Sequence, residues 1–143
     1  MTNQEIAAKV SQFINYNVSK EGVTCKEFAA RKELNYKLIN AYSNGTRIPR
    51  LYNYIVIYKM IADNLARADA EKIATNTIDN FLDEIAILFS KGYKYADFEQ
   101  ITGIPDAIFY KYKKRLVKDV SLNHAMIIIE RFNLNFKIPG LID

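Results

Sequence analysis

The sequence predicts an all-α protein made of two tandem helical bundles, and three observations support this fold class. Apolar residues recur at steps of three and four positions instead of alternating, which is the period of amphipathic helices. Only five Gly and three Pro occur among 143 residues, so few positions interrupt regular structure. The apolar pattern of the first half also returns in the second half, which indicates an internal repeat.

The first element is a helix of about four turns that ends near Gly22. Gly22 can adopt the left-handed conformation that commonly follows the last turn of a helix. The apolar positions of this helix keep helical spacing and predict one buried face. They are Ile6, Val10, Phe13, Ile14 and Val18.

Two short helices are expected next, over residues 24–32 and 35–43. Thr24 and Asn35 each begin one of them, because their side chains can accept hydrogen bonds from the exposed amides of a first turn. Asn44-Gly45 ends the second short helix. The residues expected to point inward are Phe28, Ala29, Leu38, Ile39 and Tyr42.

A fourth helix is expected over residues 51–65, and the pattern then begins again at an offset of 70 or 71 positions. This repeat predicts two domains, residues 1–66 and 76–143, with a boundary near residues 66–76 whose own composition is helical. The matched apolar positions are Val10 and Phe81, Ile14 and Ile85, Val18 and Phe89, Phe28 and Phe98, Ile39 and Phe109, Tyr42 and Tyr112, Leu51 and Leu122, and Ile55 and Met126.

The composition is typical of a soluble globular protein. Half of the residues are hydrophobic and a quarter are charged, and no uncharged apolar run is long enough to cross a membrane. The first residues lack the layout of a signal peptide and the single Cys cannot form an internal disulfide, so we expect a cytoplasmic protein without a membrane partner. One His and one Cys exclude an ordinary zinc cluster of these ligands, and we expect no metal and no other cofactor.

Basic charge is concentrated in one segment. The chain has 20 Lys and Arg against 16 Asp and Glu, a formal net charge of +4, which permits a polyanionic partner without requiring one. Residues 108–118 hold five basic side chains and no acidic one, whereas residues 72–106 hold six acidic side chains against three lysines.

Residues 24–62, TCKEFAARKELNYKLINAYSNGTRIPRLYNYIVIYKMIA, resemble the helix-turn-helix family of the lambda repressor and Cro proteins. Two positions depart from that family: Lys32 stands where an apolar residue is usual, and Glu33 stands where the family favours the turn glycine. The residues that carry the resemblance are Thr24, Lys26-Glu27-Phe28-Ala29, Leu34, Ile39, Tyr42, Asn44-Gly45, Arg47, Pro49 and Leu51.

The second half resembles the same family more distantly, and here the turn glycine is present as Gly103. Glu99 occupies the position of a small residue, Asp106 would face a phosphate-rich surface, and Lys113-Lys114-Arg115 replaces the Asn-Gly loop. The residues that carry the resemblance are Phe98, Thr102-Gly103-Ile104-Pro105, Ile108-Phe109, Tyr112 and Ser121-Leu122.

The resemblance implies that helix 35–43 enters the major groove of double-stranded DNA. Lys37 can donate to guanine, Asn40 can pair with adenine, and Tyr36 can contact a thymine methyl. The expected base contacts are Asn35, Tyr36, Lys37, Asn40 and Ala41. The expected phosphate contacts are Thr24, Cys25, Lys26, Asn44, Thr46, Arg47 and Arg50.

The second bundle supplies further candidates, for which a non-specific phosphate clamp competes with ordinary favourable charge at a helix end. It is either a second DNA-binding module or the dimerisation module of a homodimer. The candidates are Tyr110, Lys111, Lys113, Lys114, Arg115 and Lys118.

The sequence therefore predicts a sequence-specific DNA-binding transcriptional regulator, a repressor of a phage or other mobile element. The alternative is a helix-turn-helix-derived protein that binds a protein, such as a phage inhibitor of the anti-CRISPR type acting on a host nucleic-acid enzyme. RNA binding is a weaker option. We do not expect an enzyme, because His124 and Cys25 have no catalytic partner in sequence and no nucleotide-binding motif is present.

Overall fold

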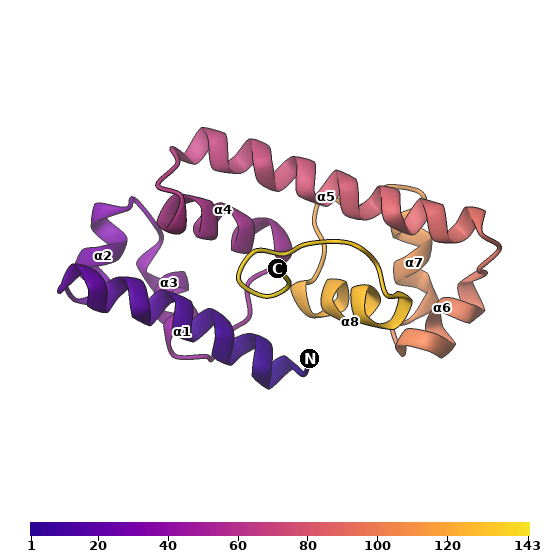
Figure 1. Ribbon diagram of the computed structural model, residues 1–143, viewed down its shortest axis with the longest axis horizontal. Coiled ribbons are helices and arrows are strands. Elements are labelled where there is room, and N and C mark those ends of the chain that lie inside the picture. Colours follow the sequence, from indigo (N-terminus) through magenta and orange to yellow (C-terminus); the bar gives the residue numbers. More distant parts are fainter.

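The protein is all-helical, as predicted. A computed structural model describes residues 1–143 and has eight helices. Short loops join them into an elongated molecule (Figure 1). The helices are α1 (Asn3–Glu21), α2 (Cys25–Arg31), α3 (Tyr36–Ser43), α4 (Leu51–Ala62), α5 (Arg67–Ser90), α6 (Tyr95–Thr102), α7 (Asp106–Lys113) and α8 (Leu122–Phe132).

The predicted capping residues of the first half are confirmed. The Thr24 hydroxyl accepts from the main-chain N of Glu27 at 3.2 Å, and the Asn35 carboxamide accepts from the main-chain N of Leu38 at 3.1 Å. Both bonds satisfy amides that have no partner within their own helix. Gly22 ends α1 in the left-handed conformation, with φ of 67°.

The order of helices is the same in both halves: a long helix, two short helices and a helix of 11 or 12 residues. The backbone repeats too, because residues with positive φ occur in pairs separated by 69 or 70 positions, and only Gly140 has no counterpart. The pairs are Gly22 and Gly92, Glu33 and Gly103, Gly45 and Arg115, and Asn64 and Asn133.

The turn between α2 and α3 shows how the chain accommodates Glu33 in place of glycine. Glu33 has φ of 57°, and Gly103 at the equivalent turn between α6 and α7 has φ of 75°. The main-chain N of Leu34 donates to the Ala29 carbonyl at 2.8 Å, which closes the end of α2. Both turns therefore have a left-handed residue at the same place, and the first half uses a residue that disfavours this conformation.

Residues 66–76, where the sequence places the boundary between domains, lead into and form the first turns of α5. This helix continues without a break to Ser90 and packs along α4, so it runs beside both halves (Figure 1). The buried residues of the two halves belong to one hydrophobic cluster of 32 residues. The division into two domains stays a prediction.

Aromatic side chains fill the core of the second half. Phe98 is fully buried, and its ring stacks on Phe109 at a centroid distance of 4.6 Å. The Phe98 ring also lies 4.5 Å from the ring of Phe89 and 5.3 Å from that of Phe132. These contacts hold α6 and α7 against the ends of α5 and α8.

Polar contacts join the loop before α8 to the start of α4. Asp119 accepts from the main-chain N of Tyr52 at 3.0 Å and pairs with Arg50, with 3.2 Å between Nε and Oδ2. The main-chain N of Leu51 donates to the Val120 carbonyl at 3.0 Å. The second half therefore supplies hydrogen-bond acceptors for the first turn of α4 in the first half.

The segment after α8 crosses back to the first half, as the yellow trace in Figure 1 shows. The Tyr54 hydroxyl of α4 donates to the Pro139 carbonyl at 2.6 Å, and Ile138 and Leu141 are buried. A Cβ atom on Gly140 would lie 2.7 Å from the Tyr54 hydroxyl oxygen. The close approach of this backbone to α4 therefore requires glycine.

Candidate nucleic-acid interface

The α3 helix presents one face to solvent and buries the other. Ile39 and Tyr42 are buried against the neighbouring helices, as predicted. Tyr36 is 41% exposed and Lys37 is exposed, whereas Asn40 and Ala41 are half-buried. The first turn of α3 therefore offers the most accessible of the predicted base-contacting side chains.

No acidic residue lies in the first turn of α3. The positive end of its helix dipole is therefore not neutralised by a carboxylate of its own helix, which favours an anionic partner. Asn35 is exposed, but its carboxamide oxygen is used to cap the helix. Its side-chain NH2 group remains as the donor for an external partner.

The predicted phosphate-contacting residues differ in whether their side chains already bind other groups of the protein. Lys26, Asn44 and Arg47 are exposed, and neither cation forms a salt bridge. The Thr46 hydroxyl donates to the Ala41 carbonyl at 3.1 Å, and that of Thr24 is engaged with Glu27. These two hydroxyls stabilise the ends of their own helices.

The side chains of Cys25 and Arg50 already contact other residues of the protein. Cys25 is half-buried and packs against the hydrophobic core. Arg50 is 58% exposed but is paired with Asp119. Arg50 is therefore the member of the predicted phosphate-contacting set whose charge already has an acidic partner.

The first turn of α7 differs from that of α3 in charge. Asp106 begins α7, and its main-chain N donates to Oε1 of Glu99 at 3.1 Å. Two carboxylates therefore occupy the helix end that corresponds to the predicted base-contacting end of α3. Phosphate groups would be repelled there, so the two short helices are not electrostatically equivalent.

The opposite end of α7 is basic and carries aromatic side chains. The Lys113 ammonium lies 4.8 Å from the ring centroid of Phe89 and 5.5 Å from that of Tyr95, and the Tyr95 ring lies 6.1 Å from that of Tyr110. Tyr110 is 48% exposed. We call these four residues the aromatic–lysine surface.

The remaining candidates of the second half differ in their surroundings. Lys111 and Lys114 are exposed and form no salt bridge. Arg115 pairs with Asp83 of α5, and Lys118 lies in the loop before α8. Lys91 and Lys94 were not among the predicted candidates, and both are exposed on either side of Tyr93 where α5 turns into α6. Their spacing around an aromatic residue is the signal that would have added them to the candidates.

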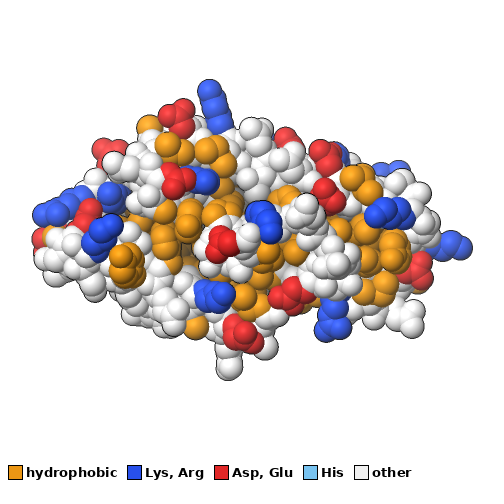
Figure 2. Space-filling model, in the orientation of Figure 1, with side chains coloured by type: hydrophobic (Ala, Val, Ile, Leu, Met, Phe, Trp, Pro, Cys, Tyr) orange, Lys and Arg blue, Asp and Glu red, His pale blue; other side chains and the backbone are white.

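Basic and acidic side chains are interspersed on the face of the molecule shown in Figure 2. Hydrophobic side chains gather on the same face at the end that holds α6. This face therefore has no extended field of one sign. Electrostatic attraction for a polyanion depends on local groups of cations, such as those around α3 and the end of α7.

His124 is half-buried at the start of α8. Burial lowers its pKa below the ordinary value, and the nearby charge of Arg50 lowers this pKa further. The structure brings no three His, Cys, Asp or Glu side chains together as a metal site. No helix combines the length and apolar character needed to span a membrane.

Comparison of the chain with protein-family models, with curated protein sequences and with solved structures gives no match.

Proposed function

We propose that the protein is a sequence-specific DNA-binding transcriptional regulator, and that α3 reads bases in the major groove. The observation that carries this proposal is the first turn of α3, which is exposed, free of carboxylates and preceded by a left-handed turn after α2. A helix that follows such a turn and leaves its N-terminal residues accessible can insert them between the phosphate backbones.

Lys37 and Asn40 are the proposed base readers, with Tyr36 beside them. The Lys37 ammonium can donate to the O6 and N7 atoms of guanine, and the Asn40 carboxamide can make two bonds to adenine. Lys26 and Arg47 lie on either side in sequence and are free to bind phosphates. Their contacts would fix the position of α3 without selecting a sequence.

The second half is proposed to contact DNA without reading bases. Glu99 and Asp106 oppose insertion of the first turn of α7. Lys111 and Lys114, at the other end of the helix, are free of acidic partners. These lysines would bind phosphates beside the site that α3 reads.

A protein partner is the second candidate, and one observation favours it. The same carboxylates at the start of α7 lie in a half that also exposes Tyr93 and Tyr110. Exposed tyrosines combine apolar area with a hydrogen-bonding group and are enriched where proteins bind one another. A helix-turn-helix repeat that had become an inhibitor of a nucleic-acid enzyme would present such a surface.

Selection from a random pool tests the proposal. The purified chain is incubated with random double-stranded DNA near physiological salt, and the bound fraction is recovered over several rounds and sequenced. We expect one enriched site, in which substitution of a single base pair lowers affinity by about 1–3 kcal/mol.

The matched control is the Lys37→Ala variant carried through the same selection. Under the proposal, this variant should lose the preference at one or two base pairs of the site. If the parent protein enriches no sequence and binds only weakly and in a salt-sensitive way, base readout is refuted. A protein partner then becomes the better explanation.

A further inference from the structure

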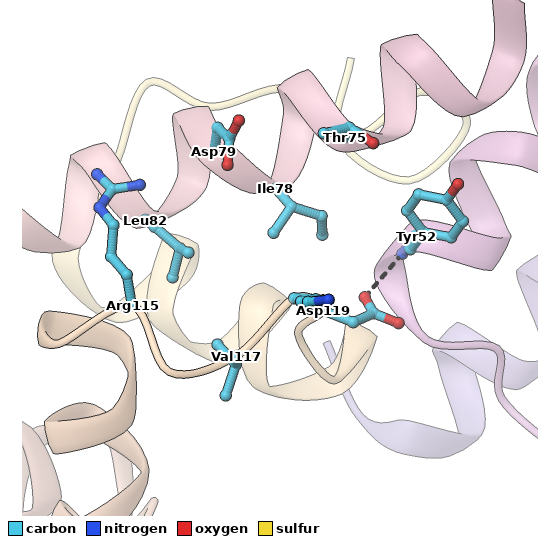
Figure 3. Close-up of a pocket in the computed structure, with 9 residues that line it drawn as sticks. Tyr52, Thr75, Ile78, Asp79, Leu82, Arg115, Val117 and Asp119 are labelled. Carbon is cyan, nitrogen blue, oxygen red and sulfur yellow. Dashed lines mark hydrogen bonds between the residues drawn. The ribbon is translucent and has the colours of Figure 1, made fainter.

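A cavity of about 530 Å³ lies between the two halves of the chain. One wall is α5, another is the loop between α7 and α8, and Tyr52 at the start of α4 closes one side (Figure 3). This volume is within the range of small-molecule sites in proteins, about 300–1,000 Å³. The size is therefore suited to a small organic ligand.

The floor of the cavity is apolar. Ile78 and Leu82 extend from α5 toward the loop before α8 (Figure 3), and Val117 of that loop also lines the cavity. Thr75, Ile78, Asp79 and Leu82 share one face of α5, because residues three and four positions apart lie on the same side of a helix. One helical face therefore presents both apolar side chains and a carboxylate to the cavity.

Four charged side chains line the cavity, and two of them already have protein partners. Asp119 accepts from the main-chain N of Tyr52 and pairs with Arg50, and Arg115 pairs with Asp83. These two side chains are part of the contacts that join neighbouring segments. They are not free to recognise a ligand without breaking those contacts.

The other two charged side chains have no partner. Asp79 and Lys118 are exposed and form no salt bridge, either with each other or with another residue. The cavity therefore offers one free carboxylate, one free ammonium and an apolar floor. A ligand complementary to this set carries a cation, an anion and an apolar body.

We propose that this cavity binds a small zwitterion of the aminocarboxylate class. Its ammonium pairs with Asp79, its carboxylate pairs with Lys118, and its apolar part contacts Ile78, Leu82 and Val117. Both pairs are charge-assisted hydrogen bonds, which are the stronger kind in proteins. The apolar contact excludes a purely polar zwitterion such as glycine from tight binding.

Calorimetric titration of the full chain with three probes tests the proposal without DNA. L-leucine and L-phenylalanine carry both charges on one carbon, and 6-aminohexanoate carries them at opposite ends of an apolar chain. We expect at least one to bind in a one-to-one ratio with a dissociation constant on the order of millimolar or below. Glycine, hexanoate and hexylamine should each bind at least about tenfold more weakly than that probe.

Two single-residue variants assign the charges. Lys118→Met should lower the affinity for the zwitterion about tenfold and leave that for hexylamine unchanged, because hexylamine has no carboxylate. Asp79→Asn should lower the affinity for the zwitterion similarly and leave that for hexanoate unchanged. Lys137→Met, an exposed lysine outside the cavity lining, is the control and should change neither affinity.

The absence of binding by all three zwitterions overturns the proposal. So does binding that is no tighter than that of the singly charged analogues, or that survives both substitutions. Asp79 and Lys118 are exposed, and circular dichroism of each variant checks that its helices are retained. The site does not depend on the proposed DNA-binding function, so either proposal can fail while the other stands.

Discussion

Asp119 binds the start of α4 through both of its carboxylate oxygens. Oδ2 lies 3.2 Å from Nε of Arg50, and Oδ1 accepts from the main-chain N of Tyr52 at 3.0 Å. Arg50 is the N-cap residue of α4 and makes no side-chain capping bond of its own. The Asp119 carboxylate, from the other half of the chain, therefore caps the N-terminus of α4.

Removal of this carboxylate should destabilise the protein. We expect Asp119→Ala to lower the free energy of unfolding by about 1–2 kcal/mol, because it leaves the Tyr52 amide without its acceptor. Asp119→Asn keeps an acceptor oxygen and should cost less, since an ion pair with a largely exposed Arg50 contributes only about 0–1 kcal/mol. Urea denaturation measures both variants, and equal losses would contradict the capping role.

The left-handed turn residue Glu33 offers a stabilising substitution. We expect Glu33→Gly to raise the free energy of unfolding by up to about 1 kcal/mol, because glycine adopts φ of 57° without the steric cost of a Cβ atom. Glu33→Ala is the control and should not stabilise. At the equivalent turn, Gly103→Ala should cost about 1 kcal/mol, although no atom lies within 4 Å of the added Cβ.

The proposed DNA contacts predict two distinct kinds of defect. Lys37→Ala should cost about 1–3 kcal/mol on the selected site and relax its sequence preference. Arg47→Ala should weaken binding to all sequences alike and reduce the salt dependence of log K by about one unit. Fluorescence anisotropy over a range of salt concentrations distinguishes these outcomes. Lys137→Ala, in the segment after α8, is the control and should change neither the affinity for DNA nor its salt dependence. Identical, sequence-independent losses of affinity for Lys37→Ala and Arg47→Ala would refute the assigned roles.

Stability should fall as the pH drops from about 7.5 to 5.5. Burial, assisted by Arg50, holds the pKa of His124 below 6.5 in the folded protein, so the unfolded chain binds more protons in this range. The stabilisation from neutral His124 is present above pH 6.5 and is lost as the pH falls toward the folded-state pKa. His124→Gln should flatten the dependence of the urea midpoint on pH between these limits. An unchanged slope would show that other groups cause it.

The hydroxyl of Tyr54 predicts how firmly the segment after α8 is held. Tyr54→Phe removes the 2.6 Å bond to the Pro139 carbonyl and should lower the free energy of unfolding by about 1–3 kcal/mol, because a partly buried acceptor loses its donor. Hydrogen exchange of the Ile142 amide, which donates to the Ile138 carbonyl at 2.7 Å, should accelerate. Tyr16→Phe, at a position that is 67% exposed, is the matched control and should change neither measurement.

Local features of the fold were predictable from the sequence, because their signals lie within a few residues. Thr24 and Asn35 cap the helices that they were expected to begin, and Gly22 ends α1. The repeat of apolar residues also predicted the repeated order of helices. The capping inferences depend on residues within a single turn, and the repeat depends on matching helical spacings between the two halves of the sequence.

Contacts between distant segments were not predictable in the same way. Nothing near Asp119 in the sequence indicates that it binds Arg50 and Tyr52, because such pairs are set by how the halves pack. The pairing with Asp119 leaves the Arg50 guanidinium less available to a DNA phosphate than the sequence prediction assumed. The acidic character of the first turn of α7, by contrast, was predictable from the sequence, because Glu99 and Asp106 both lie near it. The structure adds the hydrogen bond from the main-chain N of Asp106 to Oε1 of Glu99.

The course of residues 138–142 has a consequence for biosynthesis. This segment leaves the ribosome long after α4, yet Ile138 and Leu141 are buried and Pro139 supplies the acceptor for Tyr54 of α4. α4 is therefore fully covered only after residues 138–142 have been synthesised and have left the ribosome. Each half contains the same order of helices, but the first half does not complete its folding alone. It needs residues 138–142, so the two halves complete their folding together.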